Sequence, residues 1–92
     1  MTASLPWTTA WITGASTGIG REVALQMAAA GVRVAASSRS AASLEGLHPN
    51  IRPYPLDVTD AAAVAETVAR IEAELGAIDL AVFAAAVYAP VD

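Results

Sequence analysis

The sequence contains no cysteine and no lysine. The absence of cysteine excludes disulfide bonds and thiolate metal sites, and we expect no metal centre. The five basic residues are all arginines, scattered through a chain of net charge −4, so we expect no nucleic-acid partner. The longest uncharged apolar run, residues 80–91, is too short to span a bilayer. The first basic residue is Arg21, so no signal-peptide n-region is present, and we expect a cytoplasmic protein.

The chain is short and apolar. At 92 residues it holds one domain at most, and 55% of its residues are hydrophobic, which is too many for a disordered chain. We expect residues 1–8 to form an N-terminal arm and residues 9–92 to form the domain.

Apolar runs alternate with helical periodicities along the domain. We expect strands at 9–13, 32–37, 51–56 and 78–87, helices at 18–30 and 60–75, and a short helix at 41–47. The apolar face of the first helix is predicted from Ile19, Val23 and Met27, and that of the second from Val64, Val68, Ile71 and Leu75. This β-α-β-α-β-α-β order predicts an α/β fold with a parallel sheet. Pro53 and Pro55 place the third strand at an edge, as in the strand order 3-2-1-4.

A glycine-rich segment, TGASTGIG at residues 13–20, joins the first strand to the first helix. A helix N-terminus offers unpaired N–H groups to an anion, and glycines let the backbone approach it closely. The segment is not a P-loop, because Arg21 and Glu22 follow Gly20. Its spacing does not match GxGxxG either. The pattern TGxxxGxG resembles the cofactor loop of the short-chain dehydrogenase/reductase family; the alternative is an ordinary βα turn without a ligand.

The resemblance implies a partial Rossmann-type domain whose loop binds a dinucleotide. The pyrophosphate would lie over the helix N-terminus, and the Ser16 and Thr17 hydroxyls would donate to phosphate, hold the turn, or do both. The implied contacts in the loop are Gly14, Ser16, Thr17, Gly18, Ile19 and Gly20.

The end of the second strand bears on the choice between NAD and NADP. Ser38 stands where NAD-preferring members of the family carry aspartate, and Arg39 resembles the arginine of NADPH-preferring members. We therefore expect NADP rather than NAD. The alternative is that Arg39 is a solvated surface arginine that contacts no cofactor. Asp57 and Val58 resemble the family's adenine-contacting pair; alternatively, Asp57 only caps the following helix.

The fourth strand departs from the family pattern. Its end reads Phe83-Ala84-Ala85-Ala86 where the family usually has Asn-Asn-Ala-Gly. By position, Ala84, Ala85 and Ala86 would still contact the cofactor. The family's catalytic Tyr-x-x-x-Lys is missing, because the chain has no lysine, so we assign no catalytic residue.

These observations predict the NADP-binding N-terminal part of a short-chain oxidoreductase, truncated after the fourth strand. The whole enzyme would transfer a hydride between a nicotinamide and a carbonyl or alcohol. One alternative is a stand-alone, non-catalytic dinucleotide-binding module, completed through its fourth strand by a partner chain or by a homo-oligomer. Another is a truncated, inactive gene product.

Overall fold

Four parallel strands form the centre of the protein. The computed structural model describes residues 6–15, 18–39, 42 and 44–83. Its strands, in sequence order, are β1 (Thr9–Thr13), β2 (Arg33–Ser37), β3 (Ile51–Pro53) and β4 (Leu80–Phe83). They pair in the order β3-β2-β1-β4, and every pairing is parallel. The predicted Rossmann-type sheet and its strand order are confirmed.

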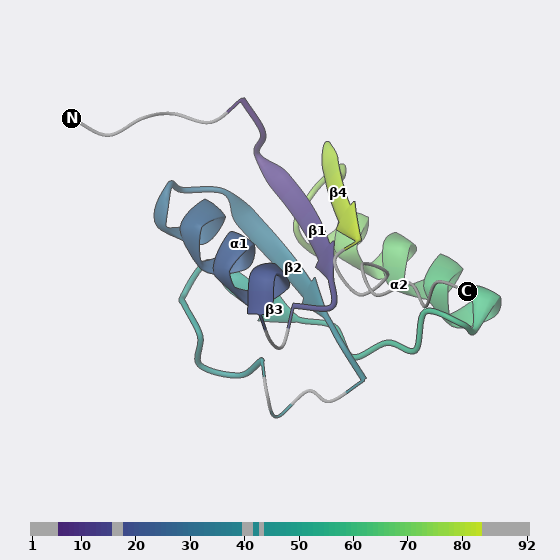
Figure 1. The fold of residues 1–92 in the computed structure, drawn as a ribbon. Helices are drawn as coiled ribbons and strands as arrows, with labels where there is room; N and C mark the ends of the chain where they lie inside the picture. The colour runs from purple at the N-terminus through teal and green to yellow at the C-terminus, as the bar shows by residue number, and fades with distance from the viewer. Residues whose placement is uncertain (1–5, 16–17, 40–41, 43, 84–92) are drawn as a thin grey trace, which may run out of the picture.

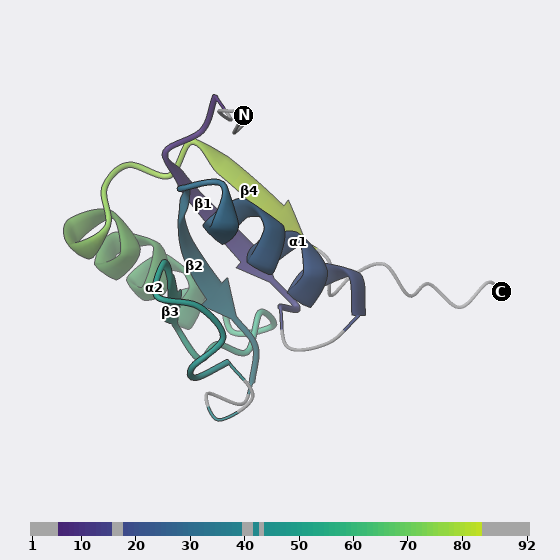
Figure 2. The same cartoon turned by 90° about the vertical axis from the view of Figure 1, so that its left-hand side faces the viewer.

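Two helices cover opposite faces of this sheet (Figures 1 and 2). Helix α1 (Gly18–Ala29) links β1 to β2, and helix α2 (Ala61–Glu74) lies between β3 and β4 in the chain. Alternation along β2 divides the core: Val34 and Ala36 pack with α1, whereas Ala35 packs on the α2 side. Both faces of the central strands are therefore apolar, as expected of a parallel sheet between two helix layers.

The buried face of α1 differs from the prediction. Small residues, Gly20, Ala24 and Ala28, are buried together with Met27, whereas Ile19 is 71% exposed. Glycine and alanine let the helix lie close to the sheet, and this turns the buried stripe one residue away from Ile19. The prediction that Ile19 packs in the core was wrong.

The short helix predicted at 41–47 is also not present among the described residues of that segment. Residues 42 and 44–46 form turns, and the backbone of Gly46 has φ +74°. A left-handed residue ends helical hydrogen bonding, which is why the segment stays irregular. Leu44 is nevertheless fully buried against the α1 side of the sheet, and Leu47 is partly buried there, as predicted.

Strand β3 forms one edge of the sheet, as its prolines predict. The regular strand ends at Pro53 rather than at residue 56, but the backbone continues to bond to its neighbour. The Tyr54 and Leu56 N–H groups donate to the Ala36 and Ser38 carbonyls, both at 2.8 Å. The intervening residues, Pro53 and Pro55, have no N–H to donate.

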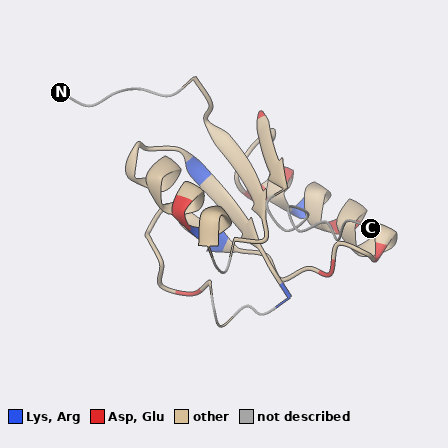
Figure 3. Cartoon of the chain, viewed as in Figure 1, with Lys and Arg blue, Asp and Glu red and all other residues tan. Residues whose placement is uncertain are grey.

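Helix α2 begins at a side-chain cap and covers its face of the sheet with one apolar stripe. Asp60 is the N-cap, and its carboxylate accepts the Ala63 N–H at 3.1 Å. Ile71 is fully buried, and the other three predicted stripe residues are partly buried around it: Val64, Val68 and Leu75. Within the described residues, neither helix has the length and apolar character needed to cross a membrane. Charged residues are distributed over both helices and the loops (Figure 3).

Candidate functional site

The glycine-rich loop leaves β1 at the carboxyl edge of the sheet, where parallel α/β proteins bind ligands. Gly14 has φ 71°, a backbone conformation that glycine adopts without strain. The N–H groups of Gly14 and Ala15 both donate to the Ser37 carbonyl, at 2.9 and 3.3 Å. The start of the loop is therefore fixed to the end of β2. Ser16 and Thr17 lie outside the described residues.

The N-terminus of α1 follows this loop. Gly18 has φ +60°, and a Cβ added to it would meet no other atom within 4 Å. The left-handed backbone, and not a lack of space, is therefore what favours glycine at this position. The first turn carries no acidic residue that would offset the positive end of the helix dipole. Gly20 is buried, while the Ile19 side chain is exposed. The helix end can therefore receive an anion next to an apolar side chain.

A pocket of about 240 Å³ opens beside this loop. Its walls come from the loop, from the end of β2 and from the segment after β3. Four of the predicted cofactor contacts line it: Gly14, Ser38, Arg39 and Val58. Ser37 and Leu56 line it as well and were not predicted. Each of these two precedes a predicted residue at the carboxyl end of its strand, so the strand order alone could have identified them.

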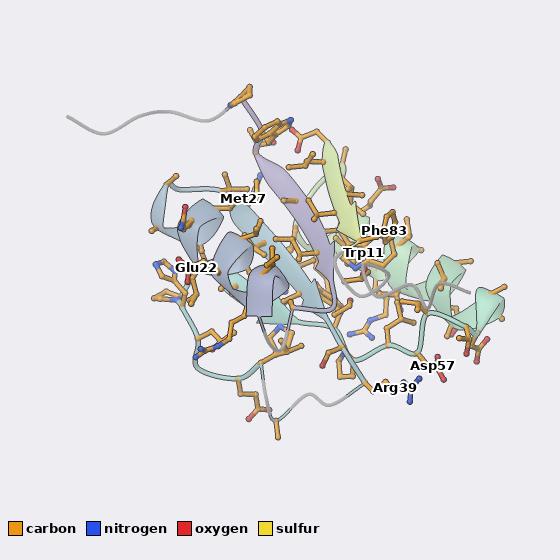
Figure 4. All side chains as sticks on the ribbon, in the orientation of Figure 1. Trp11, Glu22, Met27, Arg39, Asp57 and Phe83 are labelled. Carbon is orange, nitrogen blue, oxygen red and sulfur yellow. The ribbon has the colours of Figure 1, made fainter. Side chains whose placement is uncertain are left out.

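Arg39 lines the pocket, and Asp57 stands in the chain between two other lining residues, Leu56 and Val58. Figure 4 shows Arg39 and Asp57 at the same corner of the molecule. The Asp57 Oδ1 accepts the Thr59 hydroxyl at 2.7 Å and the Thr59 N–H at 3.0 Å. These bonds to Thr59, followed by the positive charge of Arg39, lower the pKa of Asp57 below its ordinary value. Asp57 is therefore an anionic acceptor. Its bonds to Thr59 form a turn ahead of α2, and Asp60, not Asp57, caps that helix.

Exposed apolar side chains surround the same edge. Among the described residues, the large hydrophobic side chains with high exposure are Ile19 at 71%, Phe83 at 56% and Val58 at 48%. Each stands at the end of a parallel strand or in the segment that follows one, so all three belong to the carboxyl edge. Of the three, Val58 lines the pocket, and an apolar side chain beside polar groups is typical of a ligand site. The predicted contacts Ala84, Ala85 and Ala86 lie outside the described residues.

The comparison with known proteins agrees with this arrangement. Residues 8–92 match the short chain dehydrogenase family. The chain belongs to that family. An uncharacterized oxidoreductase of Myxococcus xanthus is 40% identical over 87 residues, covering 87% of this chain and 34% of the relative. A 2,3-dihydro-2,3-dihydroxybenzoate dehydrogenase of Bacillus subtilis is also 40% identical, over 88 residues, covering 88% of this chain and 34% of the relative.

Solved short-chain dehydrogenase structures show the same fold. A betaketoacyl-[ACP] reductase from Bacteroides thetaiotaomicron superposes with a TM-score of 0.80 at 35% identity, over 89% of this chain and 42% of that one. A short-chain dehydrogenase from Streptomyces avermitilis gives 0.76 at 30% identity, over 85% and 30% of the two chains. The chain thus spans about a third of the length of its curated relatives and corresponds to their N-terminal portion.

Tyr54 does not resemble a proton-transfer tyrosine of a short-chain dehydrogenase. It is 1% exposed, its hydroxyl donates to Glu74, and the Arg70 guanidinium lies 5.3 Å from its ring centre. Burial, followed by the bond to Glu74, raises the pKa of Tyr54 above its ordinary value. General acid–base catalysis by a tyrosine near neutral pH requires a lowered pKa instead. Tyr54 instead joins β3 to α2, and Tyr88 lies outside the described residues.

Proposed function

We propose that this chain binds the adenosine half of NADP and forms the cofactor-binding N-terminal portion of a short-chain oxidoreductase. The supporting observation is the pocket that Gly14, Ser38, Arg39 and Val58 line beside the N-terminus of α1. The bound cofactor would supply the hydride chemistry, between its nicotinamide and a carbonyl or alcohol. The residues of this chain bind and orient it.

We assign the pyrophosphate, the adenine and the ribose of the cofactor to residues of this chain. The α1 N-terminus, with Gly18, Ile19 and Gly20, suits the pyrophosphate because backbone N–H groups and the helix dipole favour an anion there. Ser16 and Thr17 belong to the same proposed phosphate contacts. Asp57 suits the adenine amino group as an anionic acceptor, with Val58 against the ring. The proposed contacts of the ribose are Ala84, Ala85 and Ala86.

Preference for the 2′-phosphate is proposed from Arg39 and Ser38. The Arg39 guanidinium is exposed at the pocket and offers several N–H donors in one plane, which suits a phosphate. Ser38 adds a hydroxyl and no negative charge at the position where aspartate would repel the phosphate. The pocket therefore favours NADP over NAD.

Replacement of Arg39 tests this preference. We expect Arg39→Ala to weaken binding of adenosine 2′,5′-bisphosphate roughly tenfold or more, because a charge-assisted bond is lost, and to leave adenosine 5′-monophosphate nearly unaffected. Isothermal titration calorimetry of both ligands provides the measurement. Arg33→Ala is the matched control, because Arg33 is an exposed arginine at the other end of the same strand. Equal affinity of the wild-type and Arg39→Ala proteins for the bisphosphate would contradict the assignment.

A second candidate function is a non-catalytic dinucleotide-binding module completed by another chain. Two observations favour it. Strand β4 pairs with β1 on one side and with no other described strand, and Phe83 on β4 is exposed. The intact mass of the native gene product separates the two candidates. A species heavier than 9.3 kDa that contains these peptides supports the oxidoreductase portion. A species of 9.3 kDa supports the module, or an inactive product if it binds no adenosine ligand.

A further inference from the structure

Trp11 occupies the middle of β1 on the α2 face of the sheet and is 5% exposed. Its indole N–H donates to the Ser37 Oγ at 2.9 Å in a buried hydrogen bond. Its ring meets the Phe83 ring edge to face, with centroids 5.8 Å apart (Figure 4). Trp11 thus contacts the end of β2 on one side and the end of β4 on the other. A buried tryptophan N–H needs such a polar partner.

Ser37 is the residue through which Trp11 reaches the ligand pocket. It is the last residue of β2, fully buried, and part of the pocket wall. Its carbonyl accepts the N–H groups of Gly14 and Ala15, so it also holds the first residues of the glycine-rich loop. Ser37 therefore connects Trp11 to the glycine-rich loop and to Ser38 and Arg39, the two residues that follow Ser37 in the chain.

We propose that Trp11 is a positioning residue of the dinucleotide pocket. Its N–H fixes the Ser37 side chain, and Ser37 in turn sets the positions of the loop and of the Ser38–Arg39 segment. This inference rests on the proposed function and adds to it a residue that lines no part of the pocket. The adenine side of the pocket is bonded to Ser38 through the Leu56 N–H, and it has an additional support of its own in the turn between Asp57 and Thr59. Loss of the Trp11–Ser37 bond should therefore affect recognition of the 2′-phosphate more than recognition of adenosine.

The test compares two ligands on variants from both ends of the hydrogen bond. We expect Trp11→Phe and Ser37→Ala each to weaken adenosine 2′,5′-bisphosphate binding roughly three- to tenfold, the range of one buried hydrogen bond, with a smaller loss for adenosine 5′-monophosphate. The double variant, with both Trp11→Phe and Ser37→Ala, should bind the bisphosphate no more weakly than the single variant of lower affinity, because both substitutions remove the same bond. Phe83→Leu alters packing on the same ring but keeps the bond, so its affinity should stay within about twofold of wild type.

A spectroscopic readout covers the case in which Trp11→Phe does not fold. In a Trp7→Phe protein, Trp11 is the sole tryptophan, because the chain contains two. We expect saturation with adenosine 2′,5′-bisphosphate to change its fluorescence, and Ser37→Ala to reduce that change. An unchanged emission at saturation would overturn the inference.

The outcomes separate the inference from the proposed function. If the wild-type protein binds neither ligand, the proposed function fails, and the inference fails with it. If it binds both and Ser37→Ala keeps wild-type affinity and selectivity, only the positioning role of Trp11 is overturned. An equal loss for both ligands in Ser37→Ala and in Phe83→Leu would mean that Trp11 acts through general packing, and would also overturn it.

Discussion

Asp79 joins β1 and β4 at the end of the sheet opposite the pocket. Its Oδ2 accepts the Thr8 N–H at 3.0 Å and the Thr8 hydroxyl at 3.1 Å, and its Oδ1 accepts the Thr9 N–H at 3.0 Å. The backbone bonds from Thr8 and Thr9 are the main cause of a lowered pKa for Asp79. A single carboxylate therefore holds the start of the first strand, and its charged form accepts these bonds most strongly.

This bonding predicts an acid-dependent loss of stability. Because the folded-state pKa of Asp79 lies below its unfolded value of about 3.9, its contribution is present above that value and is lost as the pH falls through the folded pKa. We expect Asp79→Asn to lower the free energy of unfolding at pH 7 and to lose less of it between pH 5 and pH 2 than wild type does. Urea unfolding over this pH range provides the measurement.

The matched control for Asp79 is Glu66→Gln. Glu66 is an exposed carboxylate on α2 that makes no hydrogen bond or ion pair within the described part of the chain. The Glu66→Gln protein should have a free energy of unfolding at pH 7, and an acid dependence of it, close to those of wild type. An Asp79→Asn protein with the stability of the control at pH 7 would contradict the predicted role of the carboxylate.

Helix α2 shows how one cap supports a whole element. Its stripe around Ile71 buries one side, but the first N–H groups of any helix lack partners within it. Asp60 satisfies one of them, at Ala63. We expect Asp60→Ala to destabilise the protein by about 0.5–2 kcal/mol, and Asp60→Asn, which keeps an accepting oxygen, by a few tenths at most. Urea unfolding at pH 7 distinguishes the two variants. Equal unfolding midpoints for the Asp60→Ala and Asp60→Asn proteins would show that the cap contributes nothing.

At this scale the sequence predicted the strands and the two long helices because their apolar patterns are determined locally. It did not predict that Ile19 would be exposed, because the buried face of α1 depends on how closely Ala24 and Ala28 approach the sheet. The absence of a helix near Leu44 depends on the left-handed Gly46. The bond between Trp11 and Ser37 joins residues 26 positions apart, and no local pattern indicates it.

At the scale of the whole molecule, the sheet formed by the described strands has two unlike edges. The prolines of β3 predicted one edge correctly, and the strand order followed from it and from the glycine-rich loop. Four of the predicted cofactor contacts line one pocket, and their role as contacts stays a prediction. Ser37 and Leu56 also line the pocket, and each stands one position before a predicted contact at the end of its strand, so the predicted strand order already indicated them. At the other edge, β4 carries the exposed Phe83.

The β4 edge leads to a prediction about assembly. An exposed apolar edge strand favours pairing with another chain, and a charge placed on it opposes pairing. We expect the protein to sediment as a species heavier than 9.3 kDa, and Phe83→Lys to shift it toward that mass. Ile19→Lys is the control, because it places the same charge on an exposed apolar position of α1, away from the edge. A wild-type protein that sediments at 9.3 kDa at all concentrations would contradict this expectation.

The outer side of β3 is a poor site for the addition of a strand from another chain. Strand N–H groups alternate in direction, and those of Tyr54 and Leu56 point inward to β2. The outward positions are Pro53 and Pro55, which lack the group, and Ile51, whose N–H donates to the His48 carbonyl. An incoming strand would find acceptors there but no free donors. This arrangement opposes amyloid-like templating on the β3 side, so that, of the two edge strands that the structure describes, β4 is the one open to it.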